Sequence, residues 1–147
     1  MGPLARFATP LLLLVACADD PPFLSLSTLC DDLAEDYCDA RANGCCPGVD
    51  PDPGTCRMPE VERCKTQLQA LTAEAALDYD SVEAADKRRA ARVVTDRCGA
   101  PPTLASFFTG GLADGAPCER DAQCSGGRCT PDTRVCAQTP RTLCPTP

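Results

Sequence analysis

Thirteen cysteines in a chain of 147 residues constrain the fold more than any other feature of this sequence. They make up about nine per cent of the residues, a density that approaches the level typical of disulfide scaffolds in secreted proteins. The chain has four phenylalanines, two tyrosines and no tryptophan, so its apolar core must be thin. We therefore expect disulfides to supply stability that a chain of this size would otherwise draw from burial.

Residues 14–17 (LVAC) resemble the lipobox of bacterial lipoprotein signals. The apolar run over residues 11–18 is about eight residues long, whereas a helix that crosses a bilayer needs about twenty, so a secretory signal fits better than a transmembrane anchor. Arg6 and the amino terminus would supply the positive region of a signal peptide that covers residues 1–16. The alternative is that Cys17 is an ordinary cysteine behind a plain signal peptide.

This resemblance implies that Cys17 carries a diacylglyceryl thioether and, once its amino group is free, an N-acyl chain. Two or more acyl chains give stable membrane attachment, whereas one chain anchors only marginally. Ala18 follows the cysteine in place of aspartate, which by analogy with enteric bacteria favours the outer membrane. We therefore expect a lipoprotein of the cell envelope, anchored in the outer membrane and facing the periplasm or the exterior. Residues 17–24 would form a short acidic, proline-bearing tether.

The remaining twelve cysteines are expected to form six disulfides, because an even number of thiols in an oxidising compartment suggests complete pairing. The chain has no histidine, and no two cysteines have the Cys-x-x-Cys spacing of zinc ribbons and thioredoxin-like redox motifs. We therefore expect no metal and no cofactor. The cysteines assigned to disulfides are Cys30, Cys38, Cys45, Cys46, Cys56, Cys64, Cys98, Cys118, Cys124, Cys129, Cys136 and Cys144.

Helical periodicity of the apolar residues predicts a mainly α fold, with a small antiparallel helical bundle over residues 25–100 stapled by disulfides. The helix starts are marked by N-cap residues, by a proline at a first helical position, and by Asp80 and Glu83 in a capping-box-like pair. The helices are expected over residues 27–42, 59–78 and 80–98. After a connecting segment at 101–113, residues 114–147 carry turn residues and closely spaced cysteines, which predict an irregular disulfide-rich module with short hairpins.

Three features of these segments have both a functional and a structural interpretation. The acidic face of the first helix, which includes Asp36, could dock a partner, meet solvent, or pack beside the basic third helix. Asp50 and Asp52 invite a calcium interpretation, but their spacing lacks the glycine and closing glutamate of an EF-hand loop, so turn chemistry explains them better. Phe107 and Phe108 are expected to cover the open side of the helices; exposed, they would form a binding patch.

The end of the chain resembles the small cysteine-rich modules of the Dickkopf N-terminal or EB type. The resemblance is carried by residues 114–118 (DGAPC), 124–129 (CSGGRC) and 135–136 (VC). In many lipoproteins of myxobacterial type such a module follows a cysteine-bearing helical region, and the whole chain is similar to those cysteine-rich lipoproteins. The resemblance implies a secreted, stapled, non-enzymatic protein and supplies no catalytic residues.

Composition and motifs exclude several functions. The formal charge is −7 at pH 7, and removal of Arg6 with the signal peptide makes it one unit more negative, which disfavours nucleic acid as a partner. The lack of histidine removes Ser-His-Asp and Cys-His nucleophilic systems. Two carboxylates could still form a glycosidase-like pair, but no feature of the sequence marks a cleft. We therefore expect no enzymatic activity.

The chain is expected to act as a binding or surface-display protein of the cell envelope. It would attach to the membrane through lipid on Cys17, and its partner would be another envelope or extracellular macromolecule. The alternative is a disulfide-stapled inhibitor or toxin-like effector, which would insert an exposed rigid loop into a partner's cleft. Residues 46–56 or 125–128 could present such a loop.

The number of cysteines in each region constrains how the two parts are joined. The helical region holds seven of the twelve and the module holds five, so complete pairing within the chain requires an odd number of bridges between them. Cys45 and Cys46 are adjacent, with Cα atoms about 3.8 Å apart, and must bond to different partners. Cys30 and Cys38 lie two turns apart on one helix, about 12 Å along its axis, and cannot pair with each other.

Position along an antiparallel helical hairpin suggests a specific pairing. Cys38 and Cys64 are expected at similar distances from the loop that connects the first two helices, so a bridge between them is our first choice. Cys30 lies at the far end, where no cysteine of the other helices matches it, and it is the candidate to reach Cys118 or Cys144. Many other connectivities are possible for twelve cysteines.

Replacing Cys17 with serine tests the lipoprotein interpretation. The parent protein is expected to enter the detergent phase on phase separation and to carry the mass of acyl chains, whereas Cys17→Ser should remain in the aqueous phase without that mass. Identical partitioning and electrophoretic migration of the two proteins would show that Cys17 is not lipidated.

Overall fold

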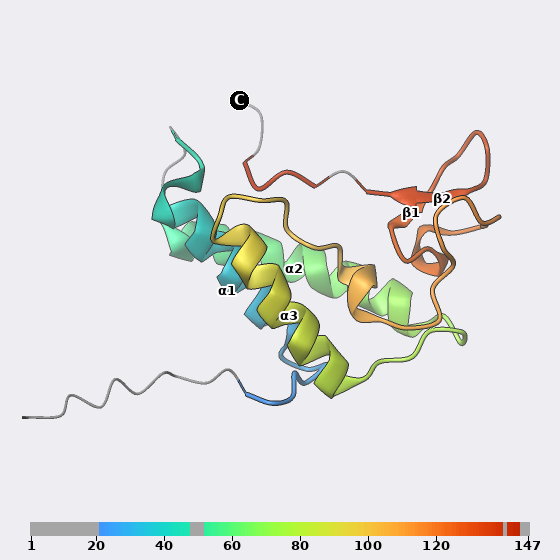
Figure 1. Ribbon diagram of the computed structural model, residues 1–147, viewed down its shortest axis with the longest axis horizontal. Coiled ribbons are helices and arrows are strands. Elements are labelled where there is room, and N and C mark those ends of the chain that lie inside the picture. Colours follow the sequence, from blue (N-terminus) through green and yellow to red (C-terminus); the bar gives the residue numbers. More distant parts are fainter. Residues whose placement is uncertain (1–20, 48–51, 140, 145–147) are drawn as a thin grey trace, which may run out of the picture.

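A computed structural model describes residues 21–47, 52–139 and 141–144, and the lipidation predicted at Cys17 lies outside the described residues. Three helices form one body, and an irregular segment with a two-stranded sheet follows them (Figure 1). Helix α1 spans Leu29–Ala40, α2 spans Pro53–Thr72 and α3 spans Ser81–Thr95. The fold is therefore mainly α and stapled by disulfides, as the sequence predicts.

Two disulfides fix the direction of α2 relative to α1. Cys30 bonds to Cys64 and Cys38 bonds to Cys56, with Cα–Cα distances of 5.5 and 5.8 Å. Because the later cysteine of α1 pairs with the earlier cysteine of α2, the two helices are antiparallel. The two bridges form rungs that hold the helices together along two turns of each.

Helix α3 runs in the same direction as α1. Near the starts of the two helices, the N–H of Leu24 donates to the carbonyl of Ser81 over 2.8 Å. Beyond their ends, Cys45 bonds to Cys98. The three helices therefore alternate in direction along the chain, which is the order expected of a small antiparallel bundle.

The start of α2 differs from the prediction. The helix begins at Pro53 and not at Pro59, and the Oδ1 atom of Asp52 caps it by accepting a hydrogen bond from the N–H of Gly54 over 3.0 Å. Asp52 thus has the local capping role that turn chemistry suggested, while Asp50 lies outside the described residues. Pro59 lies inside the helix, where its ring nitrogen cannot donate to the carbonyl of Thr55.

The end of α2 also differs, because the helix stops at Thr72 and not near Asp78. The backbone of Asp78 instead pairs with that of Thr109, with N–H to O distances of 3.1 and 2.9 Å in the two directions. This contact joins residues that are far apart in the sequence, so helical periodicity could not predict it. By contrast, the predicted N-cap of α3 is confirmed: Asp80 accepts from the N–H groups of Val82 and Glu83, while the carboxylate of Glu83 pairs with Lys87.

Helix α1 ends close to its predicted limit. It passes into a π-helical turn, Arg41–Cys45, in which Gly44 has a φ of 91°. Glycine adopts this left-handed conformation without the steric penalty of a Cβ atom, so the chain can reverse here toward α2.

The main core lies among the three helices and the segment that follows α3. A 3₁₀ turn over Leu104–Phe107 brings Phe107 and Phe108 into this core, where both side chains are almost fully buried. The prediction that these two rings cover the helices is confirmed. The buried residues of the cluster are Leu24, Leu29, Leu71, Ala84, Ala85, Leu104, Ala105, Phe107 and Phe108.

The end of the chain contains one short antiparallel hairpin among the described residues. Strand β1 spans Gly127–Cys129 and β2 spans Cys136–Gln138, with Cys129 opposite Cys136. The remainder of this region is held by turns, a 3₁₀ turn over Asp121–Gln123 and disulfides.

All twelve cysteines assigned to disulfides are paired, but two details of the predicted connectivity are wrong. Cys38 does not bond to Cys64, because α2 begins earlier than expected and carries Cys56 opposite Cys38. Cys30 does not reach the module; the bridge that crosses to it joins Cys46 to Cys144. The odd number of crossing bridges is confirmed, with one such bridge among the six that the structure contains.

An ion-pair cluster joins α1 to α3. Arg88 of α3 donates through Nε to Asp36 Oδ2 over 2.7 Å and through Nη1 to Asp32 Oδ1 over 2.9 Å. The side chains of Arg88 and Asp36 are each only 12% exposed. Part of the acidic face of α1 therefore packs against the basic face of α3, as one of the three interpretations proposed.

Replacing Arg88 with methionine is expected to lower the free energy of unfolding by about 3 kcal/mol, because Asp36 loses its main partner while it stays largely buried. Urea unfolding of the oxidised protein measures this loss. The matched control is Arg89→Met, whose side chain is 42% exposed and pairs with the exposed Asp86, and we expect it to change stability by less than about 0.5 kcal/mol. Equal losses in the two variants would contradict the role of Arg88.

Tyr79 gives the fold a dependence on alkaline pH. Its hydroxyl donates to the carbonyl of Leu24 over 2.8 Å, and burial, with a smaller effect of the charge on Asp32, raises the pKa of Tyr79 from 10.0 to about 12. The unfolded chain ionises this phenol at the lower value, so the stabilisation is fully present below pH 10 and is lost as the pH rises toward 12.

Absorbance after rapid jumps to alkaline pH should show one tyrosine that ionises near pH 12. In Tyr79→Phe this late transition is expected to disappear. A titration curve whose late transition survives the substitution would show that the burial of Tyr79 does not control it.

Candidate functional site

A cavity of 580 Å³ lies between α2, the connecting segment and the end of the chain. We call it the cleft. Glu60, Arg63, Gln67 and Leu71 line its floor, and their spacing of three or four residues places them on one side of α2. The rest of the lining comes from Tyr37, Thr66, Ala70, Thr103, Leu104, Ala105, Asp121, Ala122, Gly127, Thr139, Arg141 and Thr142.

The last described residues of the chain, Thr139 and 141–144, form a strap along α2 (Figure 1). At one end, the N–H of Thr139 donates to the carbonyl of Gly126 over 2.8 Å. At the other end, the Cys46–Cys144 disulfide ties the strap to the turn that follows α1. Leu143, only 4% exposed, packs against Cys46 in a small second core. The strap is therefore fixed at both ends and covers part of the cleft.

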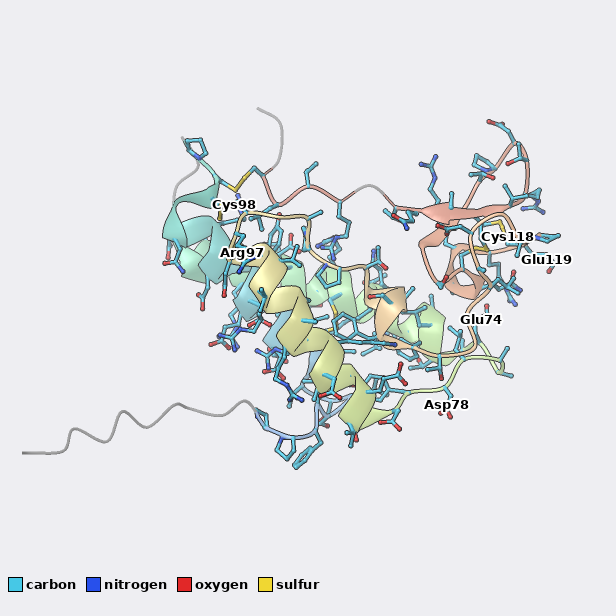
Figure 2. All side chains as sticks on the ribbon, in the orientation of Figure 1. Glu74, Asp78, Arg97, Cys98, Cys118 and Glu119 are labelled. Carbon is cyan, nitrogen blue, oxygen red and sulfur yellow. A yellow bond between two sulfur atoms is a disulfide. The ribbon has the colours of Figure 1, made fainter. Side chains whose placement is uncertain are left out.

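An ion pair attaches the module to the turn that follows α2, which ends at Thr72. Arg120 donates to both carboxylate oxygens of Glu74, each over 3.0 Å. Figure 2 shows Glu74 on the same side of the molecule as Cys118 and Glu119, with Arg97 and Cys98 at the opposite side. Cys98 is bonded to Cys45, which is adjacent to Cys46 of the Cys46–Cys144 bridge. The ion pair of Arg120 and this bridge therefore attach the module at opposite sides of the molecule, which favours a fixed orientation of the module.

Positive charge is concentrated where the strap meets α2. Arg63 forms an ion pair with Glu60, and Nη2 of Arg141 lies 4.0 Å from the same carboxylate oxygen of Glu60. Nη1 of Arg141 also donates to the carbonyl of Pro102 over 2.7 Å. Burial lowers the pKa of Arg141 from its ordinary value, and the charge on Arg63 lowers it further. Two guanidinium groups therefore share one carboxylate at this end of the cleft.

The other acidic residue that lines the cleft, Asp121, has a structural partner. Its Oδ1 atom accepts a hydrogen bond from the N–H of Cys129 over 2.7 Å, which fixes the 3₁₀ turn against β1. Between the two ends, the wall is formed mainly by short apolar side chains and hydroxyl groups. The cleft can therefore hold a ligand of mixed character, with an anionic group near Arg63 and Arg141.

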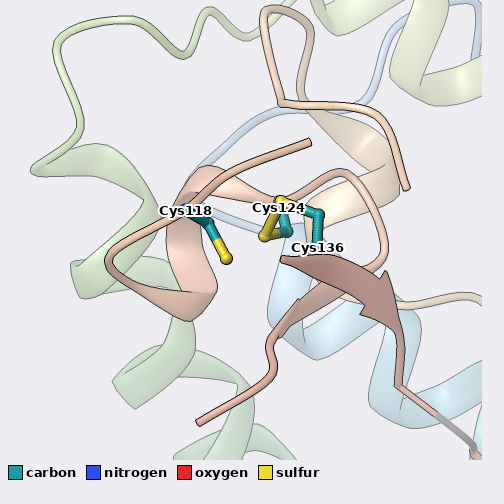
Figure 3. A group of neighbouring side chains, drawn as sticks. All are labelled: Cys118, Cys124 and Cys136. Atoms are coloured by element: carbon teal, nitrogen blue, oxygen red, sulfur yellow. A yellow bond between two sulfur atoms is a disulfide. The ribbon is translucent and has the colours of Figure 1, made fainter. Parts of the chain in front are cut away.

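The module also brings three sulfur atoms together. The Sγ atoms of Cys118, Cys124 and Cys136 lie within 4.8 Å of one another (Figure 3). Cys118 is bonded to Cys129, and Cys124 is bonded to Cys136. A metal ion is bound by thiolates, and each of these sulfurs is part of a disulfide in this structure. The group is therefore a pair of neighbouring disulfides that forms the core of the module.

The sequence did not indicate the cleft residues as a site. Glu60, Arg63 and Gln67 have helical spacing, but a polar stripe on a helix is usually its solvated face. Arg141 lies in a short proline-flanked segment without periodicity, and only the Cys46–Cys144 bridge brings it to α2. The parity of the cysteine counts signalled a crossing bridge but not which part of the chain it would hold down.

Comparison with known proteins yields no match: no family model, no curated protein and no solved structure matches the chain. None of the helices in the described part of the chain is long and apolar enough to cross a membrane.

The double substitution Cys46→Ser/Cys144→Ser is expected to free one end of the strap. It should lower the free energy of unfolding by roughly 2–4 kcal/mol, since the bridge closes a long loop, and should speed limited cleavage by trypsin after Arg141, which lies on the strap. The control Cys118→Ser/Cys129→Ser opens a bridge inside the module and should leave the rate of cleavage after Arg141 unchanged. Equal rates of cleavage with and without the Cys46–Cys144 bridge would show that this bridge does not hold the strap in place.

Proposed function

We propose that the protein is a lipid-anchored, non-enzymatic lipoprotein of the cell envelope that binds another macromolecule in the cleft under the strap. The observation that carries the proposal is the cleft itself, a cavity of 580 Å³ whose walls are held by disulfides and ion pairs. Walls fixed in this way lose little conformational entropy on binding, which favours affinity.

Several features support binding over catalysis and favour an envelope location. The chain has no histidine, and each carboxylate that lines the cleft already has a partner: Glu60 pairs with Arg63, and Asp121 bonds to the N–H of Cys129. Six disulfides suit an oxidising compartment, and the lipobox resemblance of residues 14–17 suits membrane attachment. The negative formal charge disfavours nucleic acid as the partner.

A substitution that fills the cleft tests the proposal. Ala70 lines the cleft, and Ala70→Trp should block it, whereas Ala90→Trp places the same indole on the exposed side of α3. Each full-length protein is immobilised and exposed to an envelope extract of the producing organism. We expect the parent and Ala90→Trp to retain the same macromolecule and Ala70→Trp to lose it. Equal retention by all three proteins would place binding outside the cleft and contradict the proposal.

The second candidate function is that of a disulfide-stapled inhibitor. The observation that favours it is an exposed arginine on a hairpin held by disulfides. Arg128 is exposed on β1, next to Cys129 of the Cys118–Cys129 bridge, and the Cys124–Cys136 bridge closes the hairpin. An inhibitor of this kind presents such a rigid segment to a protease cleft. Inhibition of a protease panel that is lost on reduction and in Arg128→Ala would favour this candidate, and the absence of inhibition would remove it.

A further inference from the structure

The cleft has the size of a site for a small organic ligand. Binding pockets for such ligands typically occupy about 300–1,000 Å³, and the cleft, at 580 Å³, lies inside this range. A bare inorganic anion would leave most of it empty. The apolar part of the wall comes from short side chains, Ala70, Ala105 and Ala122, with Leu71 and Leu104 beside them. Such a wall accepts a ligand body with small alkyl groups.

The polar part of the wall suits a peptide backbone. Thr66, Thr103, Thr142 and Gln67 line the same cavity, and the hydroxyl of Thr66, which donates to the carbonyl of Glu62 within α2, is left as an acceptor. Hydroxyl and amide side chains both donate and accept hydrogen bonds, so they can pair with peptide N–H and C=O groups alike. Alkyl groups and amide-pairing groups in one cavity are the combination that a short peptide of small residues requires.

The charges at one end of the cleft specify one group of that ligand. Arg63 and Arg141 both approach Glu60, so this end has one more positive than negative charge. The side chains of Arg141 and Glu60 are 22% and 20% exposed, so their charges interact more strongly than in water, whereas Arg63 is 44% exposed and contributes its charge from the rim. A guanidinium group matches the two oxygens of a carboxylate with parallel hydrogen bonds. A second carboxylate here would balance the charge.

Arg141 is positioned before any ligand binds. Its hydrogen bond to the carbonyl of Pro102 fixes one side of the guanidinium group, and the strap that carries it is tied down by the Cys46–Cys144 bridge. A side chain held in place in this way loses little rotational freedom when it binds an anion. The bridge thus contributes to the site although it lies outside the cleft lining.

We infer that the cleft binds the carboxyl-terminal segment of its macromolecular partner, a short stretch of peptide with small side chains and a free terminal carboxylate, and that Arg63 and Arg141 hold this carboxylate. The inference rests on the proposed binding function and names the chemical class of the ligand.

The test uses N-acetyl-trialanine with a free carboxylate as the probe and its C-terminal amide as the matched control. Each is titrated into the ¹⁵N-labelled full-length protein, and amide chemical shifts are followed. The acid is expected to bind saturably, with shifts at residues that line the cleft, and the amide at least about tenfold more weakly, because it offers no charged acceptor. Equal binding of acid and amide, shifts confined to other surfaces, or no binding of the acid would each overturn the inference.

Variants of Arg63 and Arg141 distinguish specific binding of the carboxylate from a nonspecific effect of the protein's positive charge. Arg63→Gln and Arg141→Gln should each weaken binding of the acid about tenfold or more, with little effect on the amide. The control Arg57→Gln removes the same charge from α2 at an exposed ion pair with Glu35 that does not line the cleft, and it should bind like the parent. An equal loss in Arg57→Gln would show that only overall charge matters and would overturn the inference.

The strap gives a second, independent variant. Cys46→Ser/Cys144→Ser keeps Arg63 and the bridges between α1 and α2 but frees the segment that carries Arg141, so binding of the acid should weaken. Unchanged affinity would show that the strap does not form part of the site. If Ala70→Trp abolishes macromolecule capture while the acid and the amide bind alike, the carboxylate inference fails and the proposed function stands. If capture is insensitive to Ala70→Trp, the proposed function itself fails.

Discussion

The disulfide between Cys46 and Cys144 joins the turn after α1 to the last described segment of the chain, across a sequence separation of 98 residues. A bridge that closes so long a loop removes much of the freedom of the unfolded chain, and it is the one covalent connection between the helices and the module among the six disulfides. It also places the strap over α2. The cleft, the position of Arg141 and the fixed orientation of the module all depend on it.

The rest of the structure compensates for a core with few large side chains. Phe107 and Leu29 are among the largest fully buried side chains, and alanines occupy many of the other core positions. The two disulfides between α1 and α2 and the ion pairs of Arg88 supply the contacts between helices that larger apolar residues would otherwise make. Stability in this protein therefore comes largely from links between specific residues, and such links fix geometry as well as energy. A site built on them has little freedom to deform.

The sequence predicted the features that depend on local chemistry or on counting. Helical spacing predicted three helices, the Asp80 cap was identified from its neighbours, and the odd numbers of cysteines required a bridge between the two regions. The connectivity failed because the start of α2 was placed too late. Cys30 and Cys38 are eight residues apart, and so are Cys56 and Cys64. Equal spacings of about two helical turns on two antiparallel helices place the four cysteines opposite one another in two pairs, so the sequence contained the information for both disulfides. The cleft carried no such signal, because tertiary contacts alone bring Arg141 to Arg63.

Peptide mapping of the oxidised protein under non-reducing conditions tests the Cys46–Cys144 connection most directly. After digestion with thiols blocked, mass spectrometry should recover the peptide that contains Cys46 joined to the peptide that contains Cys144, and reduction should separate them. Because Cys45 is adjacent, the same peptide should also be linked to the one that contains Cys98. Recovery of the Cys144 peptide as a free thiol, or bonded to Cys118, Cys124, Cys129 or Cys136, would contradict the position of the strap and of the cleft that depends on it.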